Sequence, residues 1–151
     1  MKKILSLLAL TLSTLAVASS DVSTTMNINA IIVKPLTVSH NGHMDFGVIA
    51  QNQDAWIYGK QFKVEGNPGQ SISFTINGKT LNDYNEVRIT NSDETSSVPI
   101  WLENRQVSSG SLYSPTIGEN GTFVYSFNAK LVPGTASGLH TGSLVVSVKY
   151  N

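Results

Sequence analysis

The residues best suited to bind a metal are two histidines three positions apart, with an aspartate close behind them. His40 and His43 flank Asn41-Gly42, and Asp45 follows. Imidazole nitrogens and carboxylate oxygens together bind zinc and other divalent metals. However, Asn-Gly favours a turn, and the chain has no cysteine. The spacing therefore indicates a solvated turn, and we expect neither a metal nor a cofactor.

Residues for covalent or acid–base catalysis are no better arranged. There is no Gly-x-Ser-x-Gly sequence, and the three histidines match no nucleophile with an orienting acid. Asp45-Phe46-Gly47 shares its letters with a kinase motif but lacks the accompanying loops, so we expect Phe46 in the core and Gly47 at a bend. The carboxylates lie mostly in predicted turns and form no pair that sequence would assign to glycoside hydrolysis. We expect no enzymatic activity.

Four aromatic residues raise the question of a sugar-binding platform, because flat ring faces stack on sugars at a modest entropic cost. They are Trp56, Tyr58, Trp101 and Tyr113. In a small all-β domain such residues more often pack in the core, and a core position is what we predict.

The N-terminal residues are typical of a secretory signal peptide. Lys2 and Lys3 precede an apolar run of roughly 15 residues, shorter than a membrane span of about 20. Ala16-Val17-Ala18 then offers a cleavage site. We predict a signal peptide at 1–18, and export through a periplasm to the cell surface. Its removal changes the formal charge from zero to minus two, which attracts neither nucleic acid nor an anionic membrane.

The length of 151 residues suits one domain, which must be stabilised by packing and strand pairing because it lacks cysteine. Short β-prone runs are separated by turn residues such as Asn77-Gly78 and Pro133-Gly134. The runs are 44–49, 56–58, 61–64, 71–76, 87–90, 98–102, 122–131 and 143–150. No window between them has the apolar spacing of a long amphipathic helix. The pattern predicts an all-β fold of about seven or more strands, a β-sandwich first and a barrel second.

The two ends of the exported chain carry the clearest strand patterns. Near the N-terminus, apolar side chains alternate with asparagines, and the residues on the apolar side are Met26, Ile28, Ala30 and Ile32. The last strand places on one face Leu144, Val146, Val148 and Tyr150. Gly138 is the fourteenth residue from the C-terminal end, and Tyr150 is the penultimate one.

This C-terminal pattern resembles the signature of bacterial fimbrial (pilus) subunits of the chaperone–usher type. The alternating segment after the signal peptide is similar to the donor strand of that family. The likeness spans nearly the whole exported chain, including Met44-Asp45-Phe46-Gly47 and Gly66-Asn67-Pro68-Gly69. Better-known pilins of the pathway carry a disulfide, so this chain looks closer to cysteine-free, pilin-like subclasses.

The resemblance implies an immunoglobulin-like, pilin-like sandwich at 36–151, completed by donor-strand exchange, with an N-terminal extension at 19–35 as the donor. It implies a structural subunit that polymerises head-to-tail into a surface fibre for adhesion. The implied donor residues are Met26, Ile28, Ala30 and Ile32, and the implied assembly strand contains Gly138, Leu144, Val146, Val148 and Tyr150. The implied partners are other subunits, a periplasmic chaperone and an outer-membrane usher, with a host-surface receptor left open.

Two alternatives stay open at this point. One is an exported β-sandwich that acts as a binding module, or adhesin. The other is a non-polymeric envelope or coat protein whose segment 26–32 pairs within its own sheet.

Overall fold

The computed structural model describes residues 23–151. The predicted signal peptide at 1–18 and the first part of the predicted extension lie outside the described residues. The chain divides into two units, Met1–Ile31 and Ile32–Asn151. In the described part of the first unit the backbone forms no strand, and the side chains of Met26 and Ile28 are 84% and 88% exposed.

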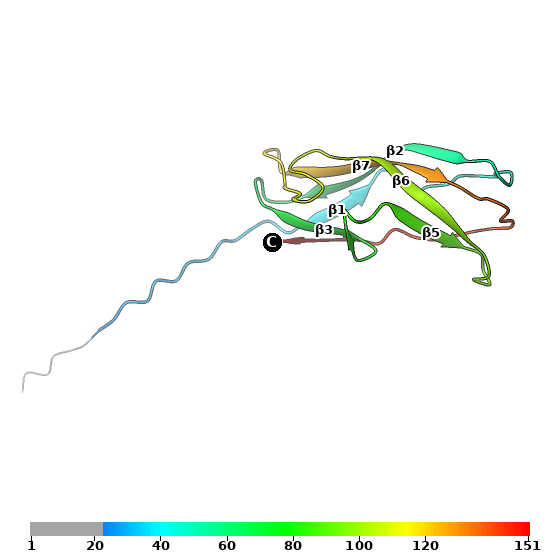
Figure 1. Ribbon diagram of the computed structural model, residues 1–151. Coiled ribbons are helices and arrows are strands. Elements are labelled where there is room, and N and C mark those ends of the chain that lie inside the picture. The colour runs from blue at the N-terminus through cyan, green and yellow to red at the C-terminus, as the bar shows by residue number, and fades with distance from the viewer. Residues whose placement is uncertain (1–22) are drawn as a thin grey trace, which may run out of the picture. The chain divides into compact units, whose positions relative to one another are not determined.

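The second unit is a β-sandwich of eight described strands (Figure 1). The strands are β1 (Thr37–His40), β2 (Ala55–Glu65), β3 (Ile72–Ile76), β4 (Lys79–Thr80), β5 (Glu86–Thr90), β6 (Ser97–Val107), β7 (Thr122–Leu131) and β8 (Val146–Tyr150). One antiparallel sheet has the order β1-β2-β7-β6-β5, and the other has the order β4-β3-β8. No helix occurs between residues 23 and 151, which confirms the all-β prediction.

β7 lies between β2 and β6 and shows why the two sheets pack together. Its side chains alternate strictly between buried and half-buried. The buried set is Phe123, Tyr125, Phe127, Ala129 and Leu131. Phe74 of β3 lies across from them, with its ring centroid 5.6 Å from that of Phe123 and 5.8 Å from that of Tyr125. A period of two thus gives this sheet one face for the core and one for solvent.

The predicted strand at 44–49 is wrong, because these residues form a loop. The carboxylate of Asp45 accepts a hydrogen bond of 2.8 Å from the backbone of Gly47, whose φ is +67°. This local turn replaces an extended backbone at a residue that tolerates positive φ. Phe46 nevertheless packs partly buried against the core, as predicted.

The prediction that the aromatic residues lie in the core is also wrong. Trp56 and Trp101 are 38% and 37% exposed, Tyr58 is 68% exposed, and Tyr113 is 80% exposed. Alternation along β2 and β6 turns Trp56 and Trp101 to the outer face, while neighbours such as Ile100 and Leu102 fill the core.

Candidate functional site

The last strand leaves one of its edges open. Among residues 23–151, β8 ends its sheet and pairs only with β3. Just beyond the strand, Asn77 N donates to Val145 O (2.8 Å) and Asn151 N donates to Ser71 O (3.2 Å). Since bonded and non-bonded positions alternate in an antiparallel ladder, Ser147 and Lys149 direct their backbone groups toward β3.

It follows that Val146, Val148 and Tyr150 direct their N–H and C=O groups to the other side. Among residues 23–151, no partner occupies these positions. An edge strand with unpaired backbone groups is a template for another strand.

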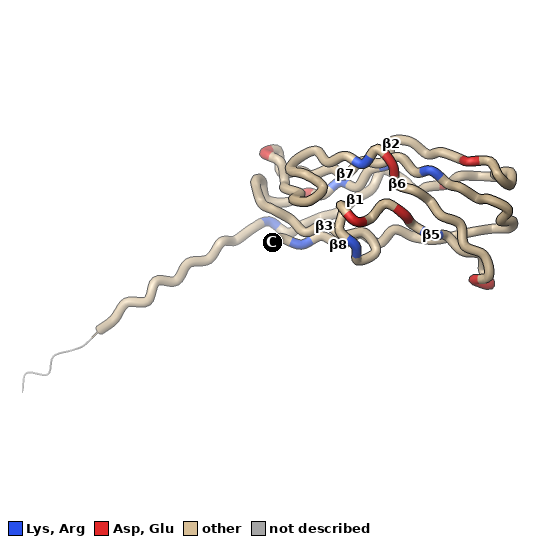
Figure 2. Tube along the Cα trace, in the orientation of Figure 1, with Lys and Arg blue, Asp and Glu red and all other residues tan. Residues whose placement is uncertain are grey.

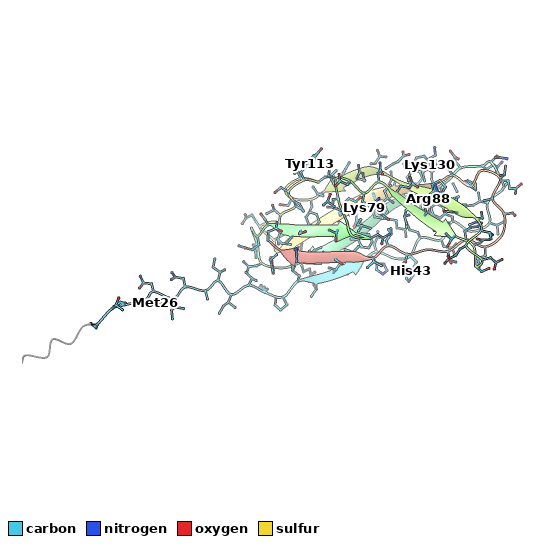
Figure 3. All side chains as sticks on the ribbon, turned by 60° about the horizontal axis from the view of Figure 1, so that its bottom comes forward. Met26, His43, Lys79, Arg88, Tyr113 and Lys130 are labelled. Atoms are coloured by element: carbon cyan, nitrogen blue, oxygen red, sulfur yellow. The ribbon has the colours of Figure 1, made fainter. Side chains whose placement is uncertain are left out.

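β1 offers a second free edge. Within the described part of the chain, it ends the larger sheet and pairs only with β2. Asn41 N donates to Gln61 O (3.3 Å), so the same alternation turns the backbone groups of Val38 and His40 away from β2. β8 and β1 appear as neighbouring arrows in Figure 3, although they belong to different sheets.

The core is incompletely covered along this opening. On β8 the inward side chains of Val146, Val148 and Tyr150 are only half-buried, and so is Leu144 just before it. The equivalent inward residues of β7 are at most 4% exposed. The difference shows that apolar surface at β8 still lacks a neighbour on one side.

A groove of about 950 Å³ is lined by His40 at the end of β1 and by Leu144, two residues before β8. Two loops border it, residues 40–49 and residues 136–144. Core side chains of the larger sheet form its floor, among them Val87, Ile89, Val98, Ile100, Phe127 and Leu131. Figure 2 shows charged residues scattered over strands and loops, without a large surface of one sign. The floor of the groove is therefore apolar, and polar side chains such as His43, Lys60 and His140 line its rim.

The far end of β8 is held in place by the hydroxyl of Tyr150. This group donates to Lys34 O (2.7 Å) and accepts a hydrogen bond from Asn67 N (2.8 Å). Gly66 lies directly beneath it, and a Cβ there would come 2.6 Å from the hydroxyl oxygen and 2.7 Å from Leu36 Cδ2. This contact needs glycine at position 66 for space, not for positive φ.

The other predicted assembly residues lie in the loop that borders the groove. Gly138 has a φ of +86° and, with Leu144, lines the groove. Between them, Thr141 exchanges two backbone hydrogen bonds with Thr90 of β5, of 2.8 and 2.9 Å. This loop therefore pairs with the end of β5 at Thr90 before β8 begins.

Of the predicted assembly residues, Val146, Val148 and Tyr150 share the inward face of β8, and the predicted donor residues are exposed. Ile28 and Ile32 are 88% and 94% exposed, and Met26 is 84% exposed. Such exposure of large apolar side chains is costly in water, and a binding partner removes the cost.

The sequence did not predict which residues form the floor of the groove. Alternation in β5 and β6 identifies Val87, Ile89, Val98 and Ile100 as inward-facing. It does not tell which inward-facing residues lack a covering strand, since that depends on the order of the strands in both sheets.

The described residues contain no cluster of side chains that could bind a metal ion. The rings of His40 and His43 lie 5.2 Å apart between centroids. No group of three or more His, Asp or Glu side chains within residues 23–151 is arranged to hold an ion. The same residues also contain no helix that is long and apolar enough to span a membrane.

Comparison of the chain with protein families, with characterised proteins and with solved structures found no match. Free ladder groups beside an apolar groove suit one kind of ligand, an extended peptide segment that adds a strand.

Proposed function

We propose that this protein is a structural fimbrial subunit that polymerises by strand donation from one copy to the next. The observation that carries the proposal is the state of β8, whose inward side chains are half-buried and whose outer ladder groups are free. An edge strand in this state can accept one further strand beside it.

The N-terminal segment has the properties that such a strand needs. It alternates apolar and polar side chains from Met26 to Ile32, and its apolar residues are exposed. Ala30 supplies one small side chain in the apolar row. The resemblance of both chain ends to chaperone–usher subunits supports the same assignment.

The free energy of such an insertion is large enough to hold a fibre together. Burial of Met26, Ile28 and Ile32 contributes on the order of 1.5–3 kcal/mol each, before the entropy cost of ordering the segment. Ladder hydrogen bonds add roughly 1 kcal/mol apiece. The sum is comparable with the stability of a whole domain, at about 5–15 kcal/mol.

The proposed contact leads to fibres because it does not close on itself. Each copy gives its segment to one neighbour and receives a segment from another, so the interface is head-to-tail. Before assembly, the open groove needs a temporary strand to prevent aggregation, which is the role that a periplasmic chaperone fills in this proposal. An outer-membrane usher then releases subunits to the cell surface, where the fibre serves adhesion.

Deletion of residues 19–33 tests the proposal. We expect the truncated protein, exported with its signal peptide, to form no fibres in electron micrographs, because no segment is left to donate. Since the truncation could also reduce folding, a full-length Ile28→Asp, Ile32→Asp variant is examined in parallel. It keeps the domain intact and makes insertion into an apolar groove unfavourable.

Fibres formed by the truncated chain would refute strand donation. A full-length chain that stays monomeric, with its own segment in its own groove, would instead support the non-polymeric envelope protein.

A further inference from the structure

The outer face of the larger sheet carries a cluster of exposed aromatic side chains, which we call the aromatic platform: Trp56, Tyr58 and Trp101. The register places Trp56 of β2 opposite Lys130 of β7, and Lys130 opposite Trp101 of β6. The two tryptophans therefore flank one lysine in a straight row across three strands.

The platform is held in a fixed arrangement. The rings of Trp56 and Tyr58 are stacked, with centroids 5.8 Å apart and planes at 5°. Lys130 Nζ lies 5.5 Å from the centroid of the Trp56 ring and 2.9 Å from a carboxylate oxygen of Asp54. Because these contacts already restrain the rings of Trp56 and Tyr58, a ligand would lose little entropy in ordering these two side chains.

A hollow of about 440 Å³ adjoins the platform at Trp101. Its walls include Asn85, Glu103, Asn104 and Leu112. Arg105 also lines it and donates hydrogen bonds of 2.8 Å to the backbone oxygens of Leu81 and Tyr84. Amide and carboxylate groups thus converge beside an aromatic wall, in a concavity within the size range of small-ligand sites.

We propose that the aromatic platform and this hollow bind a neutral oligosaccharide. The free face of Tyr58 and the edge of Trp101 offer apolar contact to the C–H faces of sugar rings. Asn85, Glu103 and Asn104 offer donors and acceptors for hydroxyl groups.

The charges favour a neutral ligand over an anionic one. Lys130 is paired with Asp54, and Arg88 is paired with Glu86 at 3.1 Å. Glu103 adds a carboxylate to the wall of the hollow. The site therefore presents little net positive charge to attract a carboxylated or sulfated sugar.

The size of the platform disfavours a protein partner. A stable protein interface uses about 20–30 residues on each side, whereas this cluster consists of three aromatic residues and a small hollow. The platform also lies on the outer face of the larger sheet, away from the groove. Figure 3 shows Lys130 on the opposite side of the drawing from β1 and β8. A filled groove would leave the platform accessible.

Intrinsic fluorescence tests the proposal directly, because Trp56 and Trp101 are the two tryptophans of the chain. The exported full-length protein is titrated with four neutral hexasaccharides, made of β-1,4-glucose, α-1,4-glucose, α-1,6-mannose and β-1,4-N-acetylglucosamine. We expect at least one of them to produce a saturable change in emission. The readout does not depend on whether the protein is monomeric or assembled, so its failure is distinct from a failure of strand donation.

Two variants locate the site. Tyr58→Ala should weaken binding by about tenfold or more, since stacking on the exposed ring is lost. It should leave the thermal unfolding midpoint nearly unchanged, because the side chain is 68% exposed. Tyr113→Ala, which removes an exposed aromatic residue outside the platform, is the matched control and should change the affinity by less than about twofold.

The proposal is overturned if none of the four sugars changes the emission up to about 10 mM. It is also overturned if Tyr58→Ala binds as tightly as the wild type. A third contradicting result is a change in sedimentation of Tyr58→Ala without sugar, which would assign the platform to contact between protein copies.

Discussion

Tyr150 joins three parts of the chain through a single hydroxyl group. It donates to Lys34 O and accepts from Asn67 N, at 2.7 and 2.8 Å. We predict that Tyr150→Phe lowers the free energy of unfolding by about 1–3 kcal/mol, because the Asn67 amide loses its acceptor in a part-buried site. Urea denaturation measures the change, and Tyr113→Phe is the control at an exposed tyrosine. Equal stability of both variants would show that the hydroxyl does not anchor β8.

Tyr125 makes the free energy of unfolding depend on pH in the alkaline range. Its side chain is fully buried, and its hydroxyl has no hydrogen-bond partner within residues 23–151. Burial raises the pKa of Tyr125 to about 12, although the Arg105 guanidinium nearby opposes the shift. The protonated phenol is therefore favoured in the folded state relative to the unfolded chain, where the pKa is about 10.

The sign of the resulting pH effect follows from proton linkage. Below pH 10 the phenol is protonated in both the folded and the unfolded state, and its contribution to the free energy of unfolding is fully present. Between pH 10 and pH 12 the unfolded chain ionises first, so stability is lost as the pH rises. The wild type loses free energy of unfolding between pH 8 and pH 11, and we predict that this loss is smaller by roughly 1 kcal/mol in Tyr125→Phe. Chemical denaturation at both pH values measures it, and an identical loss in the variant would contradict the assignment.

At the scale of the element, β8 has two faces with different roles. Val148 points toward the core with its ladder groups free, whereas Ser147 points to solvent with its ladder groups bonded to β3. We predict that Val148→Asp abolishes polymerisation, because a charge on the inward face of β8 opposes burial of that face beneath an inserted strand. Ser147→Asp, which adds the same group one position earlier, should still polymerise. Fibre yield in electron micrographs compares the two, and an equal loss in both would argue against a groove-specific effect.

The strands themselves could largely be predicted from alternation. β7 spans Thr122–Leu131, the same bounds as the predicted run, because ten residues alternate without interruption. The run at 44–49 fails because the Asp45–Gly47 turn breaks an apolar pattern that still packs on the core. In β2 and β6, register shifts at Ile57/Lys60 and Glu103/Gln106 change which residues face outward. Such bulges depend on the partner strand, so a single sequence does not reveal them.

The candidate site was predicted in part. The side chains of Val146 and Val148 share a face, as the period of two requires, and line the incomplete side of the core. Leu131 and Phe127 line the groove together with Leu144, which precedes β8. This grouping depends on the order of the strands in the folded molecule. The aromatic platform was misjudged because hydrophobicity alone does not tell which face of a strand is turned to solvent when aromatic residues lie on the outer face, as Trp56 and Tyr58 do on β2.

For the whole molecule, an unfinished sandwich predicts a specific pattern of backbone protection. In the unassembled chain, the amides of Ser147 and Lys149 are bonded to β3, whereas those of Val146, Val148 and Tyr150 face the free edge. A donated strand would bond the second set and leave the first unchanged.

Residue-resolved amide hydrogen exchange on the full-length protein, before and after fibre assembly, measures this pattern. Strand donation predicts that the amides of Val146, Val148 and Tyr150 exchange rapidly in the unassembled protein and become protected in the fibre. Ser147 and Lys149 should be protected in both states. Protection of all five amides in the solitary protein, or rapid exchange of the first three in the fibre, would contradict it.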